Sequence, residues 1–408
     1  SKSYIEGFYH DCSLLFDGGR AYLVYGNTDI WLTELREDLS GPAEGGLHRG
    51  IIRDESGRRL GYEGAHAYKV GGAYYVFLIH WLSDGSGRRT QACFRSDSLT
   101  GTFEGRDVLD DDLGYFNQGV AQGGIVDTPE GDWYAILFQD RGAVGRIPVL
   151  APLRWEDGFP VLGEGARAPA AAEAPRRLEA AAGPPDRERE PLVSSDDFLS
   201  ASGPDGEASL KPCWQWNHEA RGELWGIDAE GGGLWLASGR LSENVTRAHN
   251  VLTQRALFPS CSASVRVGGE GLADGDFAGI CALQGRYGLV ALAREGGELY
   301  AVMKGRPGGP DYTMGRTLDK EPGSEYGRVS WPGGEIELRV ELDFADMRDE
   351  ARFSYRDAGG EWRRIGAVQK LYFGLDHFVG CRIGLFLYST RTVGGKARFA
   401  DFTYSAQA

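Results

Sequence analysis

The sequence predicts an all-β protein, with part of a β-propeller at residues 1–165 and a β-sandwich at 193–408. Three similar units follow one another in the first half, each with an inner strand, a turn and an aromatic strand. Helical periodicity is absent there, and many of the chain's 61 glycines stand in short turn-like clusters. In the second half, short alternating strands separated by Gly-rich turns are typical of a two-sheet sandwich.

The three units of the first half lie at residues 8–25, 61–78 and 119–138. They recur at intervals of about 50 to 60 residues, slightly longer than the roughly 40–50 residues of typical propeller blades. A propeller needs about four to eight blades to close its ring, and three alone would leave strand edges exposed. Because the chain begins inside a motif, we expect roughly two further blades, on the order of a hundred residues, before Ser1.

The second half is expected to follow a linker at residues 166–192, where Pro, Ala and charged residues dominate. Beyond this segment, polar and apolar residues alternate with the period of two that a half-buried strand requires. The clearest of these strands lie at 234–236, 262–267, 336–342 and 352–355.

Two acidic residues occupy the same place in the first two units. Asp11 and Glu63 each precede or open an apolar strand that leads through a Gly-containing turn to a Tyr-rich strand. If the units are structurally equivalent, both acids start the innermost strand of a sheet and point at one axis. Paired carboxylates are what cleavage of a glycosidic bond needs. The alternative is that each is an ordinary turn former.

Composition excludes several classes of partner. A net charge of −15 argues against nucleic acid and anionic membranes, and no apolar run approaches the ~20 residues of a membrane span. The seven histidines show no metal-ligand spacing, and the six cysteines, with no C-x-x-C spacing, are interpreted as buried free thiols. We therefore expect no metal or cofactor, and a neutral small-molecule partner such as an oligosaccharide.

Six motifs in order make the chain resemble glycoside hydrolase family 43, the β-xylosidase and α-L-arabinofuranosidase group. The stretch D-x-S-L-x-F-D and the stretch E-G-A-H contain the two acids, and G-I-V-D-T-P-E-G-D-W is similar to the family's L-V-E-T-P-D-G-x-W. A closing G-R…W-E-D-G-F-P-V stretch and two sandwich segments complete the set. The motifs lie at 11–17, 63–66, 124–133, 145–161, 215–218 and 247–255.

The resemblance implies a five-bladed propeller, a C-terminal concanavalin-like sandwich and single-displacement inversion. By motif match Glu63 is the general acid, and Asp11 orients it and tunes its pKa. An ionised Asp11 nearby would disfavour ionisation of Glu63, so the pairing is physically sensible. The family's general base is an Asp on the first blade, expected before Ser1, so residues 1–408 by themselves are expected to show little turnover.

The resemblance also implies which residues contact the sugar. Arg141 matches a family arginine that donates hydrogen bonds to it, although an arginine in a loop is more often a surface residue. Gln122 stands where the family usually has a histidine that helps to hold a cation or water at the axis, so a metal there is in doubt. Residues 378–380 resemble a stretch whose preceding loop leans over the site, which favours exo action.

Aromatic residues near the acids could form a platform for the sugar ring. The candidates are Trp31, Trp81 and Phe116, with Tyr62 and Tyr115 beside them.

The leading hypothesis is an inverting exo-glycosidase that removes terminal β-D-xylose from xylo-oligosaccharides or hemicellulose side chains. An α-L-arabinofuranosidase on the same scaffold is the first alternative. A non-catalytic carbohydrate-binding protein is the second, motivated by the absent base and by Gln122. A structural propeller is weaker still. An Asp in an aromatic-flanked turn upstream of Ser1 would favour an enzyme.

Overall fold

The computed structural model describes residues 4–57, 60–169, 191–199, 209–228, 232–306, 320–374 and 377–407. Contacts divide the chain into two units, Ser1–Asp140 with Arg146–Pro184, and Arg141–Gly145 with Pro185–Ala408. The prediction of an all-β protein is confirmed, because the described residues contain strands and short 3-10 helices only. Most of the linker predicted at 166–192 lies outside the described residues. No described helix has the length and apolar character needed to cross a membrane.

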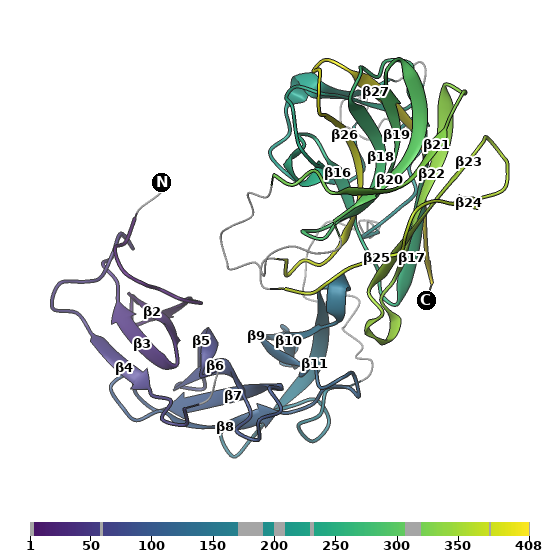
Figure 1. Cartoon of the computed structure of the whole chain (residues 1–408). Helices are drawn as coiled ribbons and strands as arrows, with labels where there is room; N and C mark the ends of the chain where they lie inside the picture. Colours follow the sequence, from purple (N-terminus) through teal and green to yellow (C-terminus); the bar gives the residue numbers. More distant parts are fainter. Residues whose placement is uncertain are drawn as a thin grey trace. The chain divides into compact units, whose positions relative to one another are not determined.

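The first unit contains three four-stranded antiparallel sheets, and in each of them the strands pair in chain order (Figure 1). The sheets coincide with the three units seen in the sequence, so each repeat is one blade-like meander. The first sheet holds β1 (Ser13–Asp17), β2 (Arg20–Asn27), β3 (Asp29–Glu34) and β4 (His48–Ile52); the second β5 (Glu63–Val70), β6 (Ala73–Trp81), β7 (Arg89–Ser96) and β8 (Glu104–Leu109); the third β9 (Ala121–Asp127), β10 (Trp133–Asp140), β11 (Arg146–Glu156) and β12 (Phe159–Leu162).

The apolar core of the first unit lies between neighbouring sheets. Val24 and Leu32 of the first sheet pack with Val76 and Leu78 of the second. Phe77, on the opposite face of β6, packs with residues of the third sheet. A strand that is covered on both faces reads as a continuous apolar run rather than an alternating one. This burial explains why the central part of β2 and most of β6 are apolar and aromatic.

The second unit is a sandwich of a seven-stranded and an eight-stranded antiparallel sheet (Figure 1). The seven-stranded order is β13 (Gln215–Trp216), β16 (Leu252–Arg255), β26 (Arg382–Ser389), β18 (Asp276–Leu283), β19 (Gly288–Glu295), β20 (Glu298–Gly305) and β21 (Ser324–Ser330). The eight-stranded sheet holds β14 (Trp225–Ile227), β15 (Leu234–Ala237), β27 (Lys396–Gln407), β17 (Ser260–Gly268), β22 (Glu335–Asp343), β23 (Glu350–Arg356), β24 (Arg363–Arg364) and β25 (Gln369–Lys370). The 3-10 helices are η1 (Gly142–Val144), η2 (Gly222–Leu224), η3 (Val245–Arg247) and η4 (Ala345–Met347).

Alternation along the central strands of the sandwich separates its core from its surface. In β22, Leu338 and Val340 are buried in the core, whereas the residues that follow each of them, Arg339 and Glu341, are only half-buried. β17 repeats this pattern along its length. The period of two predicted from the sequence is therefore the period of the pleat, with one face of the sheet in the core.

All six cysteines are free, as the sequence analysis predicted. Cys93, Cys261, Cys281 and Cys381 are buried. Cys213 is half-buried and Cys12 is exposed, so the prediction that every thiol is buried was wrong for these two residues. Cys12 immediately follows Asp11, in the segment that precedes β1.

Candidate active site

Asp11 and Glu63 come together at the beginnings of two neighbouring inner strands. Asp11 precedes β1 and has a positive φ of 45°, while Glu63 is the first residue of β5. The pairing of β5 with β6 shifts register between Glu63 and His66, a bulge that redirects the side chain at its edge. One carboxylate oxygen of each acid and a ring nitrogen of His10 all lie within 4.8 Å of one another.

The side chains of His10 and Asn27 contact the Glu63 carboxylate. His10 Nε2 lies 3.4 Å from Glu63 Oε2 and 3.4 Å from Asp11 Oδ2, so the ring bridges the two acids. Asn27, at the end of β2, donates from Nδ2 to Glu63 Oε2 across 2.8 Å. The Glu63 side chain is 19% exposed. It is therefore accessible from solvent while most of its surface is covered.

The environment of Glu63 favours its protonated form. Burial raises the pKa of the Glu63 carboxyl, and the negative charge of Asp11 raises it further, while His10 and Arg89 act in the opposite direction. A carboxyl that keeps its proton toward neutral pH can act as a general acid. Asp11 thus supplies the electrostatic effect that the motif comparison assigned to it.

An arginine pair lies beside the acids. Asp140, buried at the end of β10, forms ion pairs with Arg89 at the start of β7 and with Arg146 at the start of β11, the latter at 3.1 Å from Nε to Oδ1. The guanidinium of Arg146 lies 4.1 Å from the centre of the Phe138 ring. Asp140 and Phe138 therefore hold two cations in place on the strands of two sheets.

The charges of these arginines act on the acids. Burial lowers the pKa of Arg89 to about 10 and also lowers that of Arg146, and the charge of Glu63 opposes both shifts. Asp11 also opposes the shift of Arg146. The sequence analysis named Arg146 only as part of a motif and did not consider Arg89 or Asp140. The sequence signal that could have identified Arg89 and Asp140 is a charged residue at the end of an apolar strand.

Gln122 lies against the strand that carries Glu63. Its backbone adopts a φ of 65°, and its N–H donates to Gln91 Oε1 across 2.7 Å. The Gln122 side chain fills the space beside Gly64, because a Cβ added to that glycine would stand 2.7 Å from Gln122 Nε2. His66, two residues on, is half-buried, and burial lowers its pKa against the charge of Asp11. The structure thus places Gln122 beside Gly64, the residue after Glu63, and its part in sugar binding stays a prediction.

Arg141 is grouped by its contacts with the second unit rather than the first. Its guanidinium lies 4.9 Å from the centre of the Phe258 ring. The assignment of Arg141 to sugar binding stays a prediction, and Arg89 is the arginine whose charge acts on Glu63.

The aromatic candidates occupy different settings. Trp31 is partly exposed on β3, where it stacks on His48 with the ring centres 5.3 Å apart. Phe116 is 53% exposed between β8 and β9, and Trp81 ends β6. Tyr62 packs edge-on against the rings of Phe94 and the buried His80, and Tyr115 is buried. Trp31, Trp81 and Phe116 remain predicted platform residues, whereas Tyr62 takes part in the core.

His10, Asp11 and Glu63 are also the described residues that could hold a metal ion. One imidazole and two carboxylates are a donor set that divalent cations accept. The expectation of no metal stays a prediction, and no step below depends on an ion.

Both halves of the chain match models of a single family. Residues 1–160 match glycosyl hydrolases family 43. Residues 206–405 match the β-xylosidase C-terminal concanavalin A-like domain. The chain belongs to glycoside hydrolase family 43. Asp11 and Glu63 lie within the part that matches the family's hydrolase model.

Curated proteins with xylosidase names resemble the chain over part or most of its length. A β-xylosidase of Formosa agariphila is 24% identical over 387 residues, which cover 85% of this chain and 60% of the relative. A xylosidase/arabinosidase of Butyrivibrio fibrisolvens is 31% identical over 183 residues, covering 38% of this chain and 34% of the relative. The chain thus spans well under two thirds of the length of these curated relatives.

Solved family 43 structures share the fold. A bifunctional GH43-CE protein of Bacteroides eggerthii is 39% identical, with a TM-score of 0.82, over 98% of this chain and 48% of that one. An engineered GH43 glycoside hydrolase, described as displaying both endo-xylanase and exo-arabinofuranosidase activity, is 25% identical, with a TM-score of 0.81, over 100% of this chain and 76% of that one. These similarities support the architecture of propeller-type sheets followed by a sandwich.

Proposed function

We propose that the protein is an exo-acting glycosidase that removes terminal β-D-xylose from xylo-oligosaccharides or hemicellulose side chains with inversion. The observation that carries the proposal is the Glu63 carboxyl, largely covered, within 4.8 Å of Asp11 and with a raised pKa. Membership of family 43 supports the reaction class, and the β-xylosidase of Formosa agariphila supports the sugar.

In the proposed mechanism Glu63 donates its proton to the glycosidic oxygen as the bond to the anomeric carbon breaks. Water attacks that carbon from the opposite face and gives its proton to a carboxylate base. An acid and base that leave room for this water stand about 6.5–9.5 Å apart. Asp11 lies closer to Glu63 than that, which fits a residue that orients the acid and tunes its pKa.

Arg146 and Arg89 supply the donors for sugar hydroxyls in this scheme. A guanidinium has five N–H groups in a fixed plane, which suits a pair of neighbouring oxygens. Asp140 holds both arginines, so their orientation exists before the substrate arrives.

The test uses the full-length gene product. We expect 4-nitrophenyl β-D-xyloside to be hydrolysed faster than 4-nitrophenyl α-L-arabinofuranoside, and NMR to show the α-anomer of xylose first. Glu63→Gln should slow hydrolysis of xylobiose far more than that of the nitrophenyl substrate, because the sugar released from xylobiose is a poor leaving group that needs a proton. Glu130→Gln, at an exposed turn, is the matched control.

Three outcomes would contradict parts of the proposal. The β-anomer as first product would favour retention, with Asp11 as the nucleophile. Faster cleavage of the arabinofuranoside would favour the alternative sugar, which the name of the Butyrivibrio relative includes. Unchanged xylobiose hydrolysis in Glu63→Gln would remove Glu63 from the mechanism.

A further inference from the structure

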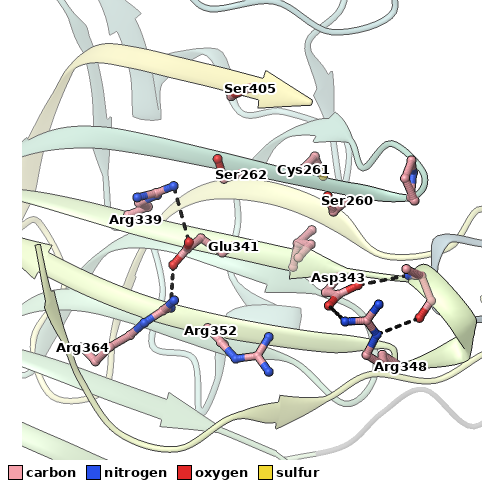
Figure 2. A pocket seen from close by; sticks show the side chains of 13 residues that line it. Ser260, Cys261, Ser262, Arg339, Glu341, Asp343, Arg348, Arg352, Arg364 and Ser405 are labelled. Atoms are coloured by element: carbon pink, nitrogen blue, oxygen red, sulfur yellow. Dashed lines mark hydrogen bonds and ion pairs between the residues drawn. The ribbon is translucent and has the colours of Figure 1, made fainter. Parts of the chain in front are cut away.

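The outer face of the eight-stranded sheet contains a polar hollow of about 410 Å³, entirely within the second unit. Four arginines and two small residues shape it, and we call it the arginine hollow. These residues are Arg339, Arg348, Arg352, Arg364, Ser262 and Ser405. Figure 2 shows them around the space between β17, β22, β23 and β27. Its volume is in the range of small-molecule sites.

Strand register explains why the face is hollow here. Ser405, Ser262, Glu341 and Arg352 are cross-strand partners in one row over four strands. The first two are serines, so half of the row has short side chains while its neighbours are long. The resulting depression has hydroxyls on its floor and guanidinium groups along its side.

Within its lining the hollow holds more arginines than carboxylates, while Asp346, outside the lining, also pairs with Arg348 at 3.5 Å. Its lining carries four arginines but only two carboxylates, Glu341 and Asp343. Glu341 lies between Arg339 and Arg364, at 3.4 and 2.5 Å, and Asp343 pairs with Arg348 at 2.9 Å (Figure 2). A surplus of positive charge in a chain of net charge −15 marks this part of the surface as unusual.

Arg352 is one of these four arginines, and its charge is only partly neutralised. Its own partner is Glu350, on the same strand, and Glu350 also binds Lys370 Nζ at 2.7 Å. The carboxylate of Glu350 is therefore shared between two cations. A guanidinium has five N–H donors, and one ion pair uses two of them at most. Donors of Arg352 therefore remain for a ligand in the hollow.

We propose that the arginine hollow binds a sugar that bears a carboxylate, such as a uronic acid residue. Arginine forks match the geometry of a carboxylate, and the serine hydroxyls can exchange hydrogen bonds with ring hydroxyls. Glu341 and Asp343 provide acceptors for further hydroxyls and would repel a compact, doubly charged anion such as phosphate. The combination of donors and acceptors therefore fits an acidic sugar better than an inorganic anion. This site uses neither Glu63 nor Asp11 and does not rest on the proposed function.

Calorimetric titration of residues 1–408 with sodium D-glucuronate and with D-glucose, at constant ionic strength, tests the proposal. The two sugars differ at one carbon, which is a carboxylate in the first and a hydroxymethyl group in the second. We expect saturable binding of glucuronate and binding of glucose that is at least tenfold weaker. Glu63→Gln should bind glucuronate as the unmodified chain does.

Two variants locate the binding. Arg364→Gln removes an exposed lining residue and should weaken glucuronate binding at least fivefold. Arg363 is the adjacent exposed residue, and its cross-strand partner is Tyr355, whereas that of Arg364 is Ser354. Arg363→Gln should therefore leave glucuronate binding unchanged. Ser262→Val would fill the floor and remove its hydroxyl, and should also weaken binding. Far-ultraviolet circular dichroism confirms that each variant is folded.

The proposal is overturned if glucose binds as well as glucuronate, or if Arg363→Gln and Arg364→Gln have the same effect. It is equally overturned if sodium phosphate binds as tightly as glucuronate and Ser262→Val changes the binding of neither ligand. The hollow would then recognise charge alone.

Discussion

At the scale of single residues, the site depends on how two carboxyl groups share one small volume. Asp11 lies in the segment before β1, where its φ is positive, and the bulge at the start of β5 positions Glu63. Burial of Glu63 and the nearby negative charge of Asp11 both raise the pKa of Glu63. The residue-scale predictions follow from this raised pKa.

Asp11→Asn should shift the pH dependence of hydrolysis. The charge of Asp11 raises the pKa of Glu63, so its removal lowers that pKa. The basic limb of kcat/KM, which reports the general acid of the free enzyme, should then move to lower pH. Asp17→Asn, which affects an acid paired with Lys69, should leave the limb in place. A limb that moves to higher pH would contradict the assignment of Asp11.

Glu63→Gln should stabilise the first unit at neutral pH and have little effect at low pH. Below the ordinary glutamate pKa, folded and unfolded chains both hold the proton. As the pH rises, the unfolded chain ionises first because the folded pKa is raised, so the unmodified protein loses stability and the variant does not. Melting temperatures of both proteins between pH 4 and 8 measure the effect. A difference that shrinks with increasing pH would contradict the raised pKa.

At the scale of elements, the bulge at the start of β5 positions Glu63. Gly64 lies in this irregular stretch with a φ of 71°, a region that favours glycine, and Gln122 occupies the space where a Cβ would be. The bulge therefore depends on a residue without a side chain. It also couples the strand of the acid to β9, which carries Gln122.

Gly64→Ala should lower the free energy of unfolding by more than Gly71→Ala does. Both glycines have a positive φ, 71° and 58°, so each variant bears a backbone penalty of about 1 kcal/mol. At Gly71 the added methyl group enters open space, whereas at Gly64 it meets Gln122. Urea denaturation of both variants isolates the contact. Equal losses would show that Gln122 moves away freely.

At the scale of the whole molecule, the chain contains two units with separate cores. The sandwich takes up one segment from the first half of the chain. Ala143 donates its N–H to Asp349 Oδ1 across 3.0 Å, and Cys381 N–H donates to Ala143 O across 2.7 Å. Arg141–Gly145 is therefore part of the second unit, although 40 residues of sequence and more separate it from the sandwich strands.

A fragment of residues 193–408 should fold but unfold more easily than the same unit in the whole chain. Without Ala143, the half-buried Asp349 and the buried N–H of Cys381 each lose a partner, at a cost of about 1–3 kcal/mol each. Calorimetry of the fragment and of the whole chain compares the two transitions. Asp349→Ala should cost less in the fragment than in the whole chain, and an equal cost in both would contradict the role of Ala143.

Much of the architecture was predictable because it depends on local periodicity. The three sheets of the first unit lie where inner strand, turn and aromatic strand recur, and the alternation in β17 and β22 separates core from surface. The closeness of Asp11 and Glu63 was predictable too, since equivalent positions in repeated units occupy equivalent positions in the fold. The motif similarity to family 43 extended this prediction to the whole chain.

Other features depend on residues that are far apart in the chain, and these only the tertiary structure decided. Arg89, Asp140 and Arg146 meet because strands from two sheets end together, and no local pattern marks that meeting. The arginine hollow arises in the same way, from a register that sets Ser262 beside Ser405 and Glu341. The sequence by itself determined where strands form, since each follows from neighbouring residues. Which side chains face one another is set by packing between strands, which no single strand encodes.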